Sequence, residues 1–276
     1  AQDASLTWDM IVIGGGATGA SVALDAASRG YRVAMLERSD FGKGTSTRST
    51  KLIHGGVRYL RQGEISLVRG ALRERDRLLH NAPHVVRPLS FVLPCYRQRD
   101  RLFYGAGLKA YDLLAGRHNI GRSRILSRDA SLEAAPTLRR FGLVGGVRYA
   151  DGQFDDADLL MHIIATAASH GAVVLNYTPV VSLQKDAAGR IVGVAARDDE
   201  TGRDWTMRAK IVINAAGPFS DAVRHMDDAS AERLITPSQG VHVVVDRRFL
   251  PGDSAVLVPK TPDGRVLFAI PWHRRV

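Results

Sequence analysis

The chain has 276 residues, of which 45% are hydrophobic, and a formal net charge of +10. This composition suits a sizeable core, and we expect one mixed architecture of two interleaved lobes. No apolar stretch is long enough to span a bilayer, residues 1–5 do not resemble a signal peptide, and the single cysteine, Cys95, excludes an intrachain disulfide and is typical of a reducing compartment.

The chain begins with the pattern of a βαβ unit. Met10–Ile13 predicts a buried strand, Ala20–Ser28 is an alanine-rich helix former, and Tyr31–Leu36 predicts a second buried strand. A glycine turn with the spacing G-x-G-x-x-G, residues 14–19, joins the first strand to the helix. The turn alone would be weak evidence, but together these elements predict a dinucleotide-binding domain of the α/β class.

The motif indicates how a dinucleotide would lie. Gly14 makes the tight turn, Gly16 lets the backbone approach a pyrophosphate, and Gly19 allows close packing of helix on strand. The helix N-terminus offers free N–H groups to the phosphates. Glu37, about 20 residues beyond the motif, is the predicted acceptor for ribose hydroxyls and disfavours NADP. The motif by itself does not separate FAD from NAD.

The next segment favours a flavin. Residues 41–50 form a loop rich in glycine, serine and threonine, whose hydroxyls suit a pyrophosphate and a ribityl chain. A nicotinamide enzyme would more often continue with another βαβ unit. Here the loop leads into residues 51–60, with the sequence Lys-Leu-Ile-His-Gly-Gly-Val-Arg-Tyr-Leu.

Residues 49–60 resemble, almost letter for letter, a flavin-facing segment of the FAD-dependent glycerol-3-phosphate dehydrogenases. Thr50 stands for a serine of that pattern and Val57 for a leucine. These enzymes form part of the D-amino-acid-oxidase branch of the flavoproteins. The resemblance implies an α/β fold, in which an FAD-binding Rossmann-type, glutathione-reductase-like domain is interleaved with a smaller α+β substrate domain.

Later segments extend the resemblance. Tyr149–Leu159 resembles the aspartate-rich approach to the family's second long helix, where Asp155 is the predicted N-cap of a helix over Leu159–Ala168. Ile211–Pro218 predicts a buried strand that ends in small residues, like the family's segment beside the FAD. Six further segments are predicted strands: Ala172–Tyr177, Val180–Lys185, Ile191–Arg197, Trp205–Ala209, Gly240–Val245 and Val266–Trp272.

The resemblance also implies domain bounds. Residues 1–82 and 149–228 are expected to form the FAD-binding domain, 83–148 an inserted substrate or membrane-facing lobe, and 229–276 an incomplete substrate domain. Three later family segments, Gly-Thr-Thr-Asp, Ser-Gly-Val-Arg-Pro and Gly-Gly-Lys-Leu-Thr-Thr-Tyr, do not occur before Val276. We therefore expect a C-terminally truncated enzyme.

The implied reaction is oxidation of sn-glycerol 3-phosphate to dihydroxyacetone phosphate, with FAD as cofactor and membrane quinone as acceptor. A glycerol-3-phosphate oxidase and a catalytically incomplete flavin-binding module stay open as alternatives. Arg58 is the predicted catalytic cation and phosphate ligand, because arginine binds phosphate through two hydrogen bonds. Lys51 and Tyr59 are further predicted substrate contacts. His242 is the preferred base and His54 the alternative, since imidazole titrates near neutral pH.

The cofactor contacts predicted from the motif and the resemblance are Gly14, Gly16, Thr18, Gly19, Glu37, Arg38, Thr45, Ser46, Lys51, Leu52, Ile53, Val181, Ala215 and Gly217. No metal site is predicted, because the nine histidines show no paired ligand spacing. Cys95 follows Leu93 and Pro94, which predicts a packing role.

A basic run, Arg97–Arg101, precedes the apolar and aromatic stretch Leu102–Leu114. This composition is typical of a helix in a membrane interface, and equally of a buried helix with a solvated basic approach. Because a quinone-linked enzyme needs membrane access, we expect a cytoplasmic protein in peripheral contact with the anionic inner face of the cell membrane. No motif indicates a nucleic-acid partner, and a homodimer stays open.

Overall fold

The computed structural model describes residues 6–60, 62–261 and 263–276, and for Arg58 only the backbone. The chain divides into two compact units, Ala1–Ser49 with Asp156–Gly240 (unit 1) and Thr50–Asp155 with Val241–Val276 (unit 2). Each unit is interleaved in sequence, but the boundaries differ from the predicted ones at 82, 148 and 228. Residues 50–82 lie in unit 2, because α3 (Ile65–Asn81) contributes Val68 and Leu72 to the core of that unit.

Unit 1 is built on a six-stranded sheet in the order β7-β2-β1-β10-β9-β8. β1 pairs in parallel with β2 and with the second half of β10, and β2 pairs in parallel with β7. The predicted βαβ unit is therefore confirmed. The bounds are β1 (Thr7–Ile13), α1 (Ala17–Ser28), β2 (Val33–Leu36), α6 (Asp156–Ser169), β7 (Val173–Leu175), β8 (Val180–Lys185), β9 (Ile191–Arg197), β10 (Asp204–Asn214) and α7 (Ser220–Asp227).

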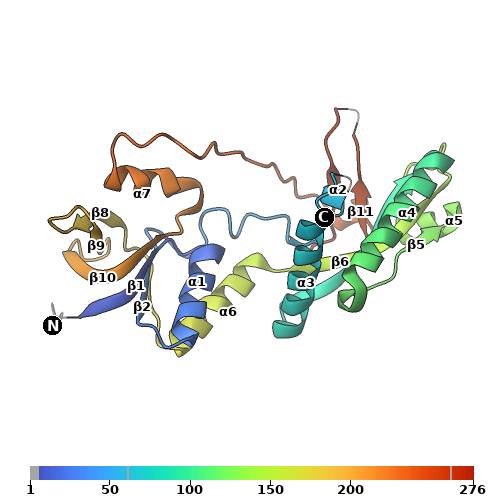
Figure 1. Ribbon diagram of the computed structural model, residues 1–276. Helices are drawn as coiled ribbons and strands as arrows, with labels where there is room; N and C mark the ends of the chain where they lie inside the picture. Colours follow the sequence, from blue (N-terminus) through green and yellow to red (C-terminus); the bar gives the residue numbers. More distant parts are fainter. Residues whose placement is uncertain (1–5, 61, 262) are drawn as a thin grey trace. The chain divides into compact units, whose positions relative to one another are not determined.

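Both faces of this sheet are covered. Because successive side chains of a strand point to opposite faces, Val12 packs on one side and Ile11 and Ile13 on the other. The Val12 side is covered by α1 and α6, which lie side by side (Figure 1), and the alanines of α1 allow the close approach. The opposite side receives Val223 of α7. This two-sided cover explains why β1 and β2 read as continuous apolar runs.

The two strands predicted at 205–209 and 211–218 form one strand, β10. Its first half pairs antiparallel with β9, through Asp204–Arg208, and its second half pairs in parallel with β1 as far as Asn214. Ile211 is 53% exposed, so the prediction of a buried strand was wrong for this residue. No glycine or proline interrupts residues 204–214, and one strand can therefore change partner at Arg208 without a turn.

Unit 2 contains a six-stranded sheet, in which five strands follow the order β12-β11-β4-β6-β3 and β5 pairs with β6. Its core joins β4, β6 and β11 to α3 and α4, around Phe91, Leu108 and Tyr149. The bounds are β3 (Leu52–Ile53), α2 (Val57–Leu60), β4 (Val86–Cys95), α4 (Gln98–Ala115), β5 (Arg124–Leu126), α5 (Arg128–Ala134), β6 (Gly145–Phe154), β11 (Ala255–Val258) and β12 (Leu267–Ala269), with 3-10 helices at Gly116–His118 and Arg247–Phe249. A further 3-10 helix, Gly217–Phe219, lies in unit 1.

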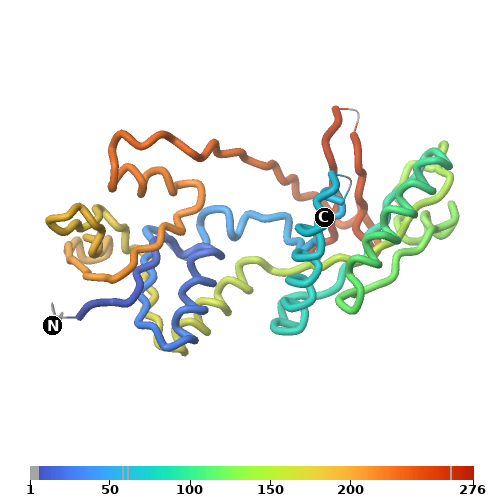
Figure 2. Tube along the Cα trace, viewed as in Figure 1, coloured from blue at the N-terminus to red at the C-terminus, as the bar shows by residue number. Residues whose placement is uncertain are grey.

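The strand predicted over Gly240–Val245 is not formed. Residues 231–245 run as chain without helix or strand (Figure 2), and Val241, Val243 and Val244 are each more than 70% exposed. An alternating apolar pattern becomes a strand only where a neighbouring strand accepts its hydrogen bonds. Within the described part of Gly240–Val245, backbone hydrogen bonds to another segment are formed only by Val245, which pairs with Val276.

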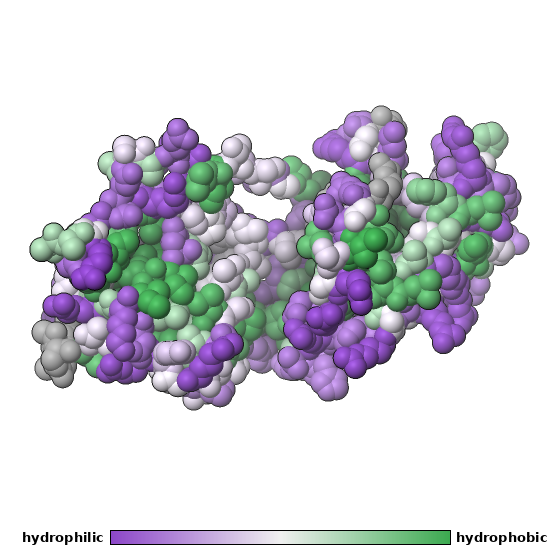
Figure 3. Space-filling model, viewed as in Figure 1, coloured by the Kyte–Doolittle hydropathy of each residue, from purple (hydrophilic) through white to green (hydrophobic). Residues whose placement is uncertain are grey.

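The segment Leu102–Leu114 is part of α4, and its two sides differ. Gly105, Leu108 and Tyr111 face the core. In contrast, Leu102 and Leu113 are 65% and 81% exposed, and Figure 3 shows hydrophobic side chains at the surface in the region of α4. Of the two interpretations of this stretch, the buried helix therefore applies only to the side of α4 that faces the core. Within the described ranges, no helix is both long and apolar enough to cross a membrane.

Candidate functional site

Unit 1 contains a cleft of about 850 Å³ at the N-terminus of α1, the α1 cleft. Its wall is assembled from the glycine motif, the end of β2, the loop over residues 41–50 and the end of β10. The structure thus brings together segments that lie far apart in the sequence, from Ile13 to Met226. The predicted cofactor contacts in this wall are Gly14, Gly16, Thr18, Glu37, Arg38, Thr45, Ser46, Ala215 and Gly217.

Two glycines of the motif have no space for a side chain. Gly14 has a φ of +114°, and a Cβ there would lie 2.5 Å from the carbonyl oxygen of Ala215. A Cβ on Gly19 would overlap the carbonyl oxygen of Gly14. Gly19 is buried and does not line the cleft, so its position agrees with the predicted role in helix packing.

The N-terminus of α1 is suited to an anion. The Ser46 hydroxyl accepts a hydrogen bond from the Ala17 N–H at 2.9 Å, and the first turn of α1 carries no acidic side chain. Lys43 and Arg48, from the same loop as Ser46, also line the cleft. The helix dipole and these two cations therefore act in the same direction on a bound phosphate.

Glu37 and Arg38 follow β2 and border the same cleft. The Glu37 carboxylate accepts backbone N–H bonds from Gly15 at 2.7 Å and from Ser39 at 2.8 Å. A carboxylate has about four lone-pair sites, so two remain for ribose hydroxyls. The Arg38 guanidinium lies 4.1 Å from the centre of the Phe219 ring, a cation–π arrangement at the edge of the cleft.

Val181 does not line the α1 cleft and is 42% exposed. Its neighbour Val180 lines the cleft instead. Because alternate residues of a strand face opposite sides, the predicted contact is displaced by one position along β8.

Unit 2 contains a second site, an apolar cavity of about 480 Å³. Of the predicted site residues, Leu52, His54 and Tyr59 lie in its wall. Further aromatic residues of this wall are Phe91, Phe103, Tyr104, Tyr149 and Phe268. We call this site the unit 2 cavity.

The segment before His54 is held along β6. Leu52 pairs with Gln153 and Ile53 with Gly152, and the carbonyl oxygen of Lys51 accepts from the Phe154 N–H at 3.1 Å. Lys51 itself has a φ of +60°, and its ammonium group lies 5.9 Å from the centre of the Trp272 ring. Contacts of Lys51, Leu52 and Ile53 with a flavin stay predictions.

Two of the predicted catalytic residues, His54 and His242, do not share a cavity wall. Both are exposed, but His54 lines the unit 2 cavity, whereas His242 lies in the chain over 231–245 and is absent from that wall. The cavity wall thus includes His54 and does not include His242, the base preferred from the sequence. Arg58 lies in α2, but its side chain is outside the described residues.

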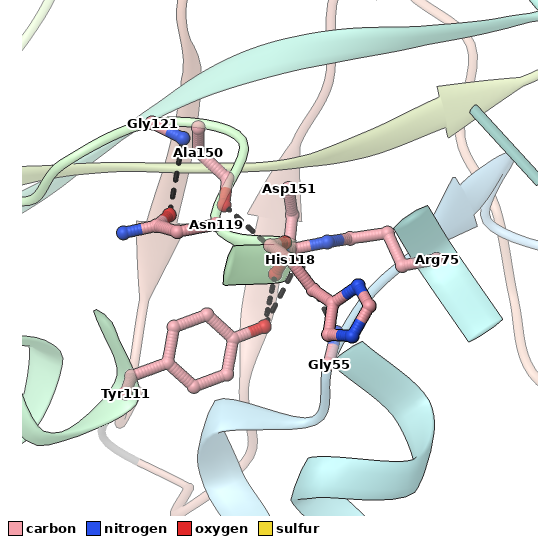
Figure 4. Close-up of polar contacts among 8 residues, drawn as sticks. All are labelled: Gly55, Arg75, Tyr111, His118, Asn119, Gly121, Ala150 and Asp151. Carbon is pink, nitrogen blue, oxygen red and sulfur yellow. Dashed lines mark hydrogen bonds and ion pairs between the residues drawn. The ribbon is translucent and has the colours of Figure 1, made fainter. Parts of the chain in front are cut away.

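A buried polar cluster borders the same cavity and is not among the predicted site residues. The Asp151 carboxylate accepts from Arg75 at 2.7 Å, from the Tyr111 hydroxyl at 3.0 Å and from the Gly55 N–H at 3.2 Å (Figure 4). The sequence groups Asp151 with the aspartates before the long helix, but the structure buries it on β6. The apolar alternation of β6, which places a carboxylate at a buried position, was the available signal.

Charges in this cluster are strongly affected by burial. Burial raises the pKa of Asp151, and the Arg75 guanidinium opposes that rise. Burial and the neighbouring Asp151 charge hold the pKa of Tyr111 well above its usual range, so its hydroxyl stays a donor.

Gln153, two residues further on β6, forms a second buried link. Its amide nitrogen donates to the Pro271 carbonyl at 2.8 Å, and its oxygen accepts from Arg87 at 2.9 Å. Asp151 and Gln153 thus lie on the same side of β6 and hold different chain segments. Within the described part of the chain, no three His, Cys, Asp or Glu residues form a group suited to a metal ion.

Comparison with known proteins gives consistent results. Residues 9–276 match the family of FAD-dependent oxidoreductases. The mitochondrial glycerol-3-phosphate dehydrogenase SDP6 of Arabidopsis thaliana is 48% identical over 287 residues, covering 100% of this chain and 46% of that protein. The mitochondrial glycerol-3-phosphate dehydrogenase of Homo sapiens is 46% identical over 279 residues, covering 97% of this chain and 38% of that protein.

A solved structure is similar over nearly the whole chain. The glycerol-3-phosphate dehydrogenase of Bacillus halodurans, complexed with FAD, aligns with a TM-score of 0.74 and 37% identity. The alignment covers 99% of this chain and 47% of that one. The chain thus spans less than half the length of these three relatives.

Proposed function

The chain belongs to the FAD-dependent oxidoreductase family, and on this premise we propose that it serves to oxidise sn-glycerol 3-phosphate to dihydroxyacetone phosphate and to pass the electrons to a membrane quinone. The observation that carries the substrate is the identity of 46–48% with glycerol-3-phosphate dehydrogenases over 97–100% of the chain. The geometry adds that His54 and Tyr59, from the segment that resembles this family, share the wall of the unit 2 cavity.

The residues of the α1 cleft fit the ADP part of FAD. The missing side chains at Gly14 and Gly16 leave space for a pyrophosphate to approach the backbone at the start of α1. Lys43 and Arg48 supply positive charge there, and Glu37 supplies the acceptor for ribose hydroxyls. The Ser46 hydroxyl already accepts a hydrogen bond from the Ala17 N–H at this helix end.

FAD, when bound, accepts a hydride from the substrate carbon. The protein's own contribution is to orient the substrate, remove its hydroxyl proton and neutralise its phosphate. We assign the proton to His54, because this imidazole lies in the cavity wall. Arg58 is assigned to the phosphate, Tyr59 to orientation of the substrate and Lys51 to a further substrate or flavin contact. In this assignment His242 has no catalytic role.

Transfer of electrons to a membrane quinone requires a surface that contacts the membrane, and α4 offers one. Leu102, Phe103 and Leu113 of α4 are exposed, and the preceding turn is rich in arginine. Such a surface suits the interface of an anionic bilayer, so we place the protein in peripheral contact with the inner face of the cell membrane. The test is binding of the protein to anionic vesicles at low salt. Binding that is weaker in Leu113→Ser supports this contact, and absence of binding by the unmodified protein would exclude it.

The test of the activity is the visible spectrum of the purified protein, recorded without oxygen before and after addition of glycerol 3-phosphate. Bleaching of an oxidised flavin band supports the proposal. A flavin band that glycerol 3-phosphate leaves unchanged would refute the substrate. Reoxidation of the bleached protein by a short-chain quinone and by air then separates a quinone-linked dehydrogenase from an oxidase.

A further inference from the structure

The cluster of Asp151, Arg75 and Tyr111 joins three elements of unit 2. Asp151 comes from β6, Arg75 from α3 and Tyr111 from α4, and Figure 4 shows the three side chains converging. The side chains of Arg75 and Asp151 are only 1% and 2% exposed. Arg75 also donates to the carbonyl oxygen of His118 at 3.1 Å, which ties the turn after α4 to α3.

A buried ion pair is weak evidence for stability, because desolvation of both charges offsets much of their attraction. An apolar replacement of similar volume is often as stable, so the cluster calls for another explanation. Its position offers one, since Asp151 lies in the wall of the unit 2 cavity together with His54.

The cluster holds the chain at the residue next to His54. Pairing of β3 with β6 ends at Ile53 and Gly152. Beyond this point the Asp151 carboxylate replaces the strand as hydrogen-bond partner and accepts the Gly55 N–H at 3.2 Å. Two residues later α2 begins, after Gly56 with a φ of +71°. The carboxylate therefore fixes the backbone where it leaves the strand and turns into the helix.

Gly55 has no freedom to move aside. A Cβ at this position would overlap the Tyr111 hydroxyl and would lie 2.5 Å from the Leu72 side chain. The Tyr111 hydroxyl in turn lies 3.0 and 3.1 Å from the two Asp151 oxygens. Backbone, carboxylate and phenol thus form one packed contact at the residue that follows His54.

We propose that Asp151, held by Arg75 and Tyr111, is a positioning residue that fixes the backbone of Gly55 and thereby the direction of the His54 imidazole in the unit 2 cavity. This inference rests on the proposed function, in which His54 removes the substrate proton. Asp151 and Tyr111 act through His54 and need no contact with the substrate.

The first experiment observes His54 directly. Its imidazole signals are followed by NMR through a pH titration of the histidine-labelled chain, with assignment from His54→Gln. The variant is Tyr111→Phe, which removes one hydroxyl and leaves the Arg75–Asp151 ion pair in place. Tyr96→Phe is the matched control, because that hydroxyl donates to the Arg139 carbonyl elsewhere in unit 2. A His54 signal that shifts or broadens in Tyr111→Phe alone supports the proposal, whereas identical His54 titrations in both variants overturn it.

The second experiment tests the effect on the reaction. Loss of one buried hydrogen bond, about 1 kcal/mol, should slow flavin reduction by roughly fivefold in Tyr111→Phe, with little change in KM. In a His54→Ala background the same substitution should have no further effect, since its route to the reaction is gone. An equal slowing in both backgrounds overturns the proposal. A wild-type chain that glycerol 3-phosphate does not reduce refutes the proposed function instead, and the NMR titration still decides the positioning role.

Asp151→Asn gives an independent check. The amide keeps the shape of the carboxylate but removes the charge opposite Arg75, so a larger displacement of the His54 signal than in Tyr111→Phe is expected. A folded Asp151→Asn protein with an unchanged His54 titration would contradict the proposal. Urea unfolding of each variant establishes that it is folded.

Discussion

The Glu37 carboxylate accepts a hydrogen bond of 2.7 Å from the backbone N–H of Gly15, inside the glycine motif. Its other oxygen accepts from Ser39. One side chain therefore fixes the turn and borders the cleft proposed for FAD. In Glu37→Gln the side-chain NH₂ group would face one of these N–H donors and could not accept its hydrogen bond. The expected loss of about 1–2 kcal/mol of binding free energy corresponds to roughly tenfold weaker FAD binding.

The affinity of this variant is measured by titration of the apoprotein with FAD, followed by flavin fluorescence. Glu200→Gln is the matched control, because Glu200 is exposed in the turn between β9 and β10 of the same unit. Equal affinities of the two variants would remove Glu37 from the cofactor site.

Gly19→Ala should destabilise unit 1. The added methyl group would overlap the Gly14 carbonyl oxygen, a backbone atom that cannot rotate away. Overpacking of this kind costs about 1–3 kcal/mol, and the midpoint of urea unfolding should fall accordingly. Gly44→Ala serves as control, since nothing lies within 4 Å of a Cβ there. Similar midpoints for both variants would contradict the packing role of Gly19.

Replacement of His54 and replacement of His242 are expected to have different effects on the rate of flavin reduction. Removal of a general base slows the reaction by about 10²–10⁴-fold, which is expected for His54→Ala in anaerobic stopped-flow measurement of flavin reduction. His242→Ala should leave that rate within about twofold, because this side chain does not line the unit 2 cavity. The reverse ranking would restore His242 as the base.

Cys95 should be unreactive in the folded chain. Burial raises the pKa of its thiol from 9.0 to about 11, so the folded state favours the protonated form. The corresponding stabilisation is complete below pH 9 and is lost as the pH rises from 9 to 11. Iodoacetamide at pH 8 should label Cys95 more than tenfold faster in urea than in buffer, and Cys95→Ala should flatten the loss of stability across that pH range. Rapid labelling of the native chain would contradict the burial of Cys95.

Gln153→Leu should destabilise unit 2 more than Arg87→Ala does. The leucine leaves the buried Pro271 carbonyl without its donor, at a cost of about 1–3 kcal/mol, whereas the exposed Arg87 can be replaced at little cost. Urea unfolding followed by tryptophan fluorescence compares the two, in a background where Trp8 and Trp205 are replaced by phenylalanine so that Trp272 reports on unit 2. Equal stabilities would mean that water satisfies Pro271 in the variant.

Local pattern was sufficient for much of the fold. The bounds predicted for β8 and β9 are those observed, and the βαβ unit begins and ends within a few residues of its predicted position. These segments were predictable because periodicity, alanine content and glycine turns act over short stretches of chain. Residues 240–245 show an equally clear strand pattern but form no strand. A strand also needs a neighbouring strand as hydrogen-bond partner, and the local sequence does not determine whether one is present.

The sequence by itself determined the family, the dinucleotide-binding glycine motif and the segment that contains His54, because these depend on neighbouring residues. Only the tertiary structure decided which side chains meet. Gly55 and Asp151 are 96 positions apart, and their contact requires β3 to pair with β6 in one register. Val180 rather than Val181 borders the α1 cleft for a similar reason, since strand register selects the side that each residue faces. Burial and long-range pairing are properties of the packed chain, and no short stretch of sequence encodes them alone.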